Sequence, residues 1–212
     1  MSNSLDDSGL PIEEAISPLR DALSTRRHCV LVAPPGAGKT TLVPLRLLNE
    51  SWLNGKRIVM LEPRRLAARA AAQRMAHLLG ESVGDTVGFQ TRDERRIGAS
   101  TRIEVVTEGI LTRRLQNDPT LEGTGLVIFD EVHERNVPTD LGLAFLLDAI
   151  KTFDSDVKVL AMSATAQAEL FSHVLADSLG DAPVVTSEGR TFPVDIRYIP
   201  KQRDERLENS IG

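Results

Sequence analysis

The chain has 212 residues, of which 41% are hydrophobic, and a net charge of −5, so its length and composition suit one α/β domain with a substantial core. The negative charge argues against a protein that coats nucleic acid by bulk electrostatics, and the single cysteine, Cys29, excludes an intramolecular disulfide and a cysteine-based zinc site. Because no apolar run approaches the length of a membrane span and the first residues lack the apolar region of a signal peptide, we expect a cytoplasmic protein.

Apolar runs of strand length alternate with segments of helical pattern along most of the chain. Ser17 and Pro18 predict the N-cap and first position of an early helix, and Gly80 predicts the end of an Ala-rich one. Strands are expected at 28–33, 57–63, 102–107, 125–131 and 158–165, and helices at 17–26, 41–52, 64–80, 108–118, 140–153 and 167–180. Strands that are apolar throughout and alternate with helices predict a mostly parallel central sheet with helices on both faces.

Three regions follow from this pattern. Residues 1–10 are polar and acidic, and we expect them to be disordered. Residues 11–190 form the predicted α/β domain. Two extended segments follow the last helix, and residues 191–212 are expected to lead from this domain into a second one.

The segment "APPGAGKTT" lies between an apolar strand and a helix, which is the context that a phosphate-binding loop requires. Gly36 and Gly38 allow the backbone to curl so that N–H groups converge on phosphates, and the helix N-terminus adds positive potential. Lys39 is expected to pair with the β and γ phosphates, and the Thr40 hydroxyl to bind Mg²⁺. The motif departs from its usual form at Ala33, which a negative φ would accommodate. The expected nucleotide-binding residues are Pro35, Gly36, Ala37, Gly38, Lys39, Thr40 and Thr41.

A second apolar strand ends in the adjacent carboxylates Asp130 and Glu131. Beside a phosphate loop, Asp130 is expected to hold Mg²⁺, partly through water, and Glu131 to orient and deprotonate the attacking water. A zinc protease site does not fit, since His133 and Glu134 are not followed by a second histidine at position 137. A Ser-His-Asp hydrolase lacks its G-x-S-x-G elbow. A plainer alternative is that the two carboxylates only cap the next element.

Six ordered segments resemble motifs of the DEAH-type superfamily 2 ATP-dependent helicases, and most of all their bacterial HrpB-type branch. "DEVH" at 130–133 resembles motif II, and "APPGAGKTT" resembles motif I. "LEPRRLAARAAAQRMA" is similar to motif Ia, "VGFQTRDE" to the segment after it, "VTEGILTRRL" to motif Ib, and "MSAT" to motif III.

This resemblance implies the first of two RecA-like domains, with ATP and Mg²⁺ as cofactors and single-stranded nucleic acid, RNA more than DNA, as partner. It implies that His133 links the nucleotide site to the motif III segment, and that Ser163 and Thr165 couple hydrolysis to strand movement. Arg74 would stack on adenine. The implied nucleic-acid residues are Arg64, Arg65, Thr107, Glu108 and Gly109. Because the arginine fingers of this family belong to the second domain, the isolated chain is expected to be nearly inactive. It is also expected to be a monomer.

The position of two of these arginines in the predicted fold agrees with a role in binding nucleic acid. Arg64 and Arg65 follow a strand, which places them at the sheet edge where open α/β folds bind ligands. Few aromatic residues are present, so backbone contacts are expected to outweigh base stacking. Two alternatives remain open, namely a phosphate-loop ATPase that remodels proteins without nucleic acid and a non-catalytic, ATP-gated binding module.

Overall fold

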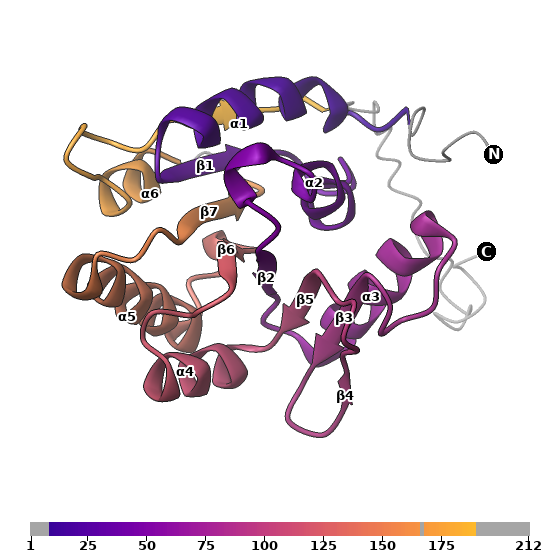
Figure 1. Ribbon diagram of the computed structural model, residues 1–212. Helices are drawn as coiled ribbons and strands as arrows, with labels where there is room; N and C mark the ends of the chain where they lie inside the picture. The colour runs from indigo at the N-terminus through magenta and orange to yellow at the C-terminus, as the bar shows by residue number, and fades with distance from the viewer. Residues whose placement is uncertain (1–8, 166–167, 190–212) are drawn as a thin grey trace, which may run out of the picture.

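The computed structural model describes residues 9–165 and 168–189, through which one eight-stranded sheet runs (Figure 1). The strands are β1 (His28–Val32), β2 (Arg57–Leu61), β3 (Val87–Gln90), β4 (Arg95–Arg96), β5 (Ile103–Val106), β6 (Thr124–Phe129), β7 (Lys158–Ser163) and β8 (Val184–Thr186). Their order in the sheet is β4-β3-β5-β2-β6-β7-β1-β8. Every neighbouring pair is parallel except β3 and β4, which confirms the predicted mostly parallel sheet.

The helices cover both faces of this sheet, as predicted. They are α1 (Glu13–Thr25), α2 (Lys39–Leu47), α3 (Arg65–Leu79), α4 (Glu108–Asn117), α5 (Val137–Phe153) and α6 (Ala168–Val174), with 3₁₀ turns at Ser51–Leu53 and Val132–Glu134. Buried side chains of α1, α2 and α3 belong to one hydrophobic cluster, and those of α4, α5 and α6 belong to the other. Figure 1 shows α1 and α2 on one side of the sheet and α4 and α5 on the opposite side.

Strand β6 shows why a continuous apolar run is needed at the centre of such a fold. Successive side chains of a strand point to opposite faces. Leu126 and Ile128 therefore enter the first cluster, while Val127 and Phe129 enter the second. All four are fully buried, so a polar residue at any of these positions would lose its water on either face of the sheet.

Helix α1 begins at Glu13 and not after Ser17, so the predicted N-cap is wrong. Pro18 lies inside the helix. Ile12, Ile16 and Leu19 follow helical spacing and are buried against the first cluster, and this apolar stripe continues through Leu23. The burial outweighs the hydrogen bond that the proline removes.

Other boundaries also differ from the sequence prediction. Helix α5 begins at Val137, with Pro138 in its first turn, whereas the periodic pattern suggested a later start. Helix α6 ends at Val174, and the following residues form a bridged turn between Asp177 and Gly180. The strands β3 and β4 were not predicted, because one is short and the other consists of two exposed arginines at the sheet edge.

The remaining predictions on domain boundaries fall largely outside the described residues. Residues 1–8 of the predicted disordered start and all of 191–212 lie outside them. Leu10 is described and packs against the first hydrophobic cluster. Strand β8 accounts for the first of the two extended segments expected near the end of the chain. Within 9–165 and 168–189, no helix is long and apolar enough to span a bilayer.

Candidate functional site

The residues predicted to bind phosphate and Mg²⁺ meet because four neighbouring parallel strands end on the same side of the sheet. Leu61 is in register with Phe129, and Phe129 is in register with Ala161. Val32 pairs with Ser163 at the end of β1. The segments that follow β1, β2, β6 and β7 therefore emerge side by side, which is the edge where open α/β sheets bind ligands.

The loop between β1 and α2 has the curled backbone that its glycines predict. Gly36 and Gly38 have φ values of 78° and 98°, which side-chain-bearing residues rarely adopt. At Gly38 a Cβ would also lie 2.9 Å from Cδ1 of Leu10, so a side chain there would displace that leucine as well as strain the backbone. Ala33 has a negative φ, which confirms that alanine is accommodated at the first position of the motif.

The rest of the loop is held by contacts to the body of the domain. Ala37 is buried, its N–H donates to the Pro34 carbonyl at 3.2 Å, and its carbonyl accepts from the N–H of Ile12 at 3.2 Å. Pro35 is exposed and borders a hollow of about 300 Å³ beside Gly36. The Thr41 hydroxyl lies 3.4 Å from the Gly38 carbonyl, so it turns back onto the loop.

Thr40 and Asp130 are in direct contact although they lie 90 positions apart. The Thr40 hydroxyl donates to Oδ2 of Asp130 at 2.6 Å, and the backbone N–H of Glu131 donates to Oδ1 at 2.9 Å. Asp130 is fully buried. Burial raises the pKa of Asp130 to about 6, although the hydrogen bond from Thr40 opposes the shift.

These two residues fit a hard cation such as Mg²⁺. The hydroxyl oxygen of Thr40 and Oδ2 of Asp130 are close enough together to bind the same cation. Both are oxygen ligands of the kind that Mg²⁺ prefers. Burial destabilises the charged form of the Asp130 carboxylate, so a nearby cation would stabilise that form.

Lys39 and Glu131 form a second contact between the start of α2 and the segment that follows β6. Nζ of Lys39 lies 3.0 Å from Oε1 of Glu131, and Lys39 is only 4% exposed. Glu131 has a φ of 54°, a left-handed conformation that is uncommon for a non-glycine residue. Such strain is typical of functional sites.

His133 joins this pair to the end of β7. Its Nδ1 lies 3.3 Å from Oε2 of Glu131 and 3.4 Å from the N–H of Ala164. Ser163 is fully buried, and its hydroxyl exchanges hydrogen bonds with the backbone of Thr165 at 3.2 Å. The carbonyl of Ser163 accepts from the N–H of Ala33 at 3.0 Å, which returns the chain of contacts to the phosphate loop.

Glu62 is a buried carboxylate at this edge that the sequence analysis did not single out. It is 3% exposed, and its Oε1 accepts from the N–H of Arg64 at 3.3 Å. Burial raises the pKa of Glu62 to about 7, and the charge of Asp130 raises it further. The available signal in the sequence for a role of Glu62 was its position between an apolar strand and "PRR".

The two predicted arginines lie at the start of α3 and are already engaged with carboxylates. Both side chains are 63% exposed. Arg64 reaches Oε1 of Glu134 at 3.4 Å through Nη2 and Oε1 of Glu62 at 3.8 Å through Nε. Arg65 pairs with Asp93, on the loop between β3 and β4.

Thr107 and Gly109 border a hollow of about 340 Å³ at the start of α4. Because Leu61 and Gln90 both pair with Val106, this hollow lies beside the end of β2 and the start of α3. Its other walls are formed by Gln90, Thr91, Arg92, Ile110 and Arg113. Arg92 and Arg113 were not singled out from the sequence. The available signal was the spacing of four between Gly109 and Arg113, which places them on one face of a helix.

Glu108 and Arg74 form no hydrogen bond or ion pair with these groups within the described parts of the chain. Oε1 of Glu108 accepts from Nδ2 of Asn136 at 3.1 Å, and burial raises the pKa of Glu108. Arg74 is exposed on α3.

Comparisons with known proteins agree with this geometry. Residues 13–172 match the family model described as DEAD/DEAH box helicase. The chain is 50% identical over 205 residues to the ATP-dependent RNA helicase HrpB of Escherichia coli, with 97% of this chain and 25% of that protein covered. It is 34% identical over 203 residues to the ATP-dependent RNA helicase HrpA homolog of Haemophilus influenzae, covering 96% of this chain and 15% of that protein.

A solved structure gives the same result. The crystal structure of the Escherichia coli DEAH/RHA helicase HrpB superposes with a TM-score of 0.82 at 48% identity, covering 94% of this chain and 25% of that one. The chain thus spans about a quarter of the length of this relative.

Proposed function

Because the chain belongs to the DEAD/DEAH box helicase family, we propose that it is the first RecA-like, ATP-binding domain of an ATP-dependent RNA helicase. In the whole protein, ATP hydrolysis would drive movement along a single strand and unwinding. The observation that carries the proposal is the direct apposition of Lys39 and Thr40 with Glu131 and Asp130.

The nucleotide site follows from this apposition. Backbone groups of the loop from Pro35 to Gly38 and the start of α2 would bind the phosphates, with Lys39 as the charged partner. Thr40 and Asp130 would hold Mg²⁺, which supplies charge neutralisation on the transferred phosphoryl group. Glu131 would orient the attacking water and accept its proton. Arg74, exposed on α3, is our candidate for stacking on the adenine.

The nucleic-acid face would be the adjacent part of the same sheet edge, after β2, β3 and β5. Arg64 and Arg65 supply cationic groups, while Thr107, Glu108 and Gly109 supply a hydroxyl, N–H groups and a helix N-terminus. The hollow at the start of α4 adds Arg92 and Arg113. Such groups contact phosphates and sugars, so we expect weak sequence preference and strong salt dependence.

We propose that coupling runs through His133. Its imidazole lies between Glu131, which faces the phosphate loop, and Ala164, which lies beside Ser163 and Thr165. A shift of Glu131 towards a phosphate-bound water would therefore change the contacts that fix the end of β7.

The isolated chain should bind nucleotide weakly and hydrolyse it slowly, since arginine fingers are expected from the second domain of the whole protein. Such an arginine raises turnover about 10³–10⁵-fold where it has been removed and restored. We further propose that this chain by itself is monomeric and that the protein is cytoplasmic.

The test is the ATPase rate of the complete protein with and without single-stranded RNA and single-stranded DNA. We expect stimulation by RNA that exceeds stimulation by DNA. Equal rates with and without either strand would favour the alternative, a phosphate-loop ATPase that remodels proteins. Unwinding of a tailed RNA duplex by residues 1–212 alone would contradict the proposed division between domains.

A further inference from the structure

A second cavity lies at the N-terminal end of β1, on the opposite side of the sheet from the strand ends that carry the phosphate loop. His28 is the first residue of β1, whereas the phosphate loop follows its last residue, Val32. The cavity has a volume of about 760 Å³, within the range of sites that hold small organic molecules. The residues that line it include His28, Leu147, Lys151, Val174, Asp177 and Leu179.

The walls of this cavity are fixed by contacts between segments that are distant in sequence. Arg26 donates to both carboxylate oxygens of Asp177, at 2.9 and 3.4 Å, and to the carbonyls of Gly180 and Asp181. The N–H of Leu179 donates to Oδ1 of Asp177 at 2.8 Å. The turn that carries Leu179 is therefore held against the end of α1, although the Leu179 side chain is 69% exposed.

His28 supplies an unsatisfied polar group at the cavity wall. The residue is 5% exposed, and its Nδ1 has no hydrogen-bond partner within the described parts of the chain. Burial lowers the pKa of His28 to about 4, so the imidazole is neutral at physiological pH. A buried ring nitrogen without a partner is costly, so a small shift of the ring towards a bound molecule that carries a hydrogen-bonding group would be favourable.

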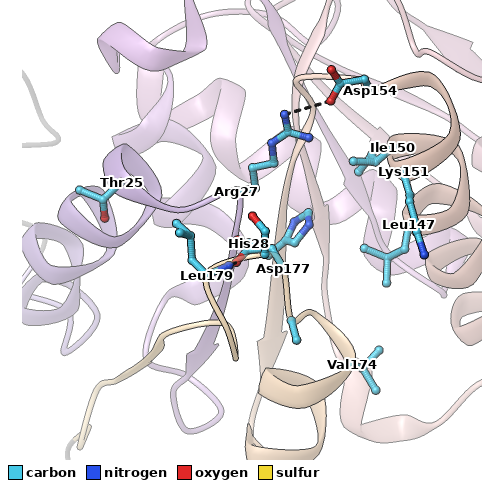
Figure 2. A pocket seen from close by; sticks show the side chains of 12 residues that line it. Thr25, Arg27, His28, Leu147, Ile150, Lys151, Asp154, Val174, Asp177 and Leu179 are labelled. Atoms are coloured by element: carbon cyan, nitrogen blue, oxygen red, sulfur yellow. Dashed lines mark hydrogen bonds and ion pairs between the residues drawn. The ribbon is translucent and has the colours of Figure 1, made fainter.

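One positively charged side chain at the cavity wall has no negatively charged partner among the described residues. Asp154 is 3.4 Å from the guanidinium of Arg27, and Asp177 is paired with Arg26. Lys151, which also lines the cavity, forms no ion pair with any residue that the structure describes. Figure 2 shows the His28 imidazole between Leu179 on one side and the α5 side chains Leu147, Ile150 and Lys151 on the other.

From these features we propose that this cavity binds a small amphiphilic anion. Its apolar body would lie against Leu147, Val174 and Leu179, its anionic group would approach Lys151, and a polar group would face His28. This site is separate from the proposed nucleotide site and does not depend on helicase activity.

The experiment uses two fluorescent probes with the same aromatic body. One is 1-anilinonaphthalene-8-sulfonate, an amphiphilic anion, and the other is N-phenyl-1-naphthylamine, which lacks the sulfonate. We expect the 212-residue chain to bind the anionic probe about 2- to 5-fold more tightly, the size of one exposed charge pair. Lys151→Ala should abolish this preference.

Two further variants test the location. Leu147→Trp should fill the cavity and weaken binding of the anionic probe at least tenfold. Leu141→Trp, on the same helix but outside the cavity, should leave it unchanged. Excess ATP should not displace the probe, since the two sites lie at opposite edges of the sheet.

Imidazole NMR of the unmodified chain keeps the test independent of how the variants fold. The ring signals of His28 should shift on titration with the anionic probe, with the same midpoint as the fluorescence. Those of His77, exposed on α3, should not shift. Unshifted His28 signals, or equal binding by a folded Leu147→Trp variant, would overturn the proposal.

Discussion

The ammonium group of Lys39 lies 3.0 Å from Oε1 of Glu131, so the lysine of the phosphate loop and the proposed general base are partners. Both side chains are largely buried, at 5% and 18% exposure. A phosphate entering the loop would compete with Glu131 for the ammonium, and Glu131 would become available to a water molecule. The contact would thus link phosphate binding to release of the proposed base.

Glu131→Gln should separate binding from turnover in the complete protein. The amide keeps the shape of the side chain but cannot accept a proton, so we expect RNA-stimulated ATP turnover to fall about 10²–10⁴-fold. Nucleotide affinity should stay equal or rise, because Lys39 loses an anionic competitor. Turnover assays and equilibrium titration with a fluorescent ATP analogue measure the two effects. The exposed Glu122→Gln should change neither, and a proportional loss of affinity and turnover would argue against the assigned role.

Thr40→Ala should destabilise the fold even without any ligand. It removes the donor at 2.6 Å from Oδ2 of Asp130, a fully buried carboxylate, and should lower the free energy of unfolding by about 1–3 kcal/mol. Urea denaturation of the 212-residue chain measures this. Thr40→Ser should retain most of the stability because it keeps the hydroxyl. Thr41→Ala, which loses only a 3.4 Å contact, should cost less than Thr40→Ala; the reverse order would contradict the argument.

The fold, and the proximity of the residues in the candidate nucleotide site, could be predicted because their signals are local. Apolar runs specify the parallel strands, and a loop such as "PPGAGKT" can be identified without knowing its surroundings. Asp130 and Glu131 were then predicted by the chemistry that Lys39 requires. The parallel register of β1, β6 and β7 brings these segments together, as the predicted topology implies.

The failures came from tertiary context. Pro18 suggests a helix start, but the buried stripe through Ile12 and Leu19 extends α1 past it. Glu62 was not singled out, because its burial next to Asp130 depends on the pairing of β2 with β6. The partners of Arg64 and Arg65 are likewise set by which loops the sheet places side by side. None of these can be read from spacing.

Glu62 should make stability depend on pH. Its pKa is raised to about 7 in the folded protein, so the folded state holds a proton that the unfolded state releases near pH 4.5. Its contribution is therefore most favourable below about pH 4.5 and declines by roughly 3 kcal/mol as pH rises to 7. Glu62→Gln removes this titration.

The measurement is the difference in unfolding free energy between Glu62→Gln and the unmodified chain across pH 4.5–8, since Asp130 and His28 also titrate there. The variant should become progressively more stable, relative to the unmodified chain, as pH rises. A difference that does not vary with pH would show that Glu62 is not held in its protonated form by burial.

Glu134 should restrain RNA binding by holding Arg64. Nη2 of Arg64 lies 3.4 Å from Oε1 of Glu134, and a phosphate would have to replace this carboxylate. In the complete protein, Glu134→Gln should tighten binding of a single-stranded RNA about 2- to 5-fold at low salt, the value of one partly exposed ion pair. Arg64→Ala should weaken binding and reduce the salt slope by about 1.

The double variant separates this contact from a general change in charge. If Glu134 acts through Arg64, adding Glu134→Gln to Arg64→Ala should give no further gain in affinity, because the two residues share one interaction. Glu169→Gln makes the same charge change at an exposed position on α6 and should leave affinity unaltered. An equal gain from Glu134→Gln with and without Arg64 would mean that the carboxylate repels RNA directly, and that Arg64 is not the group it restrains.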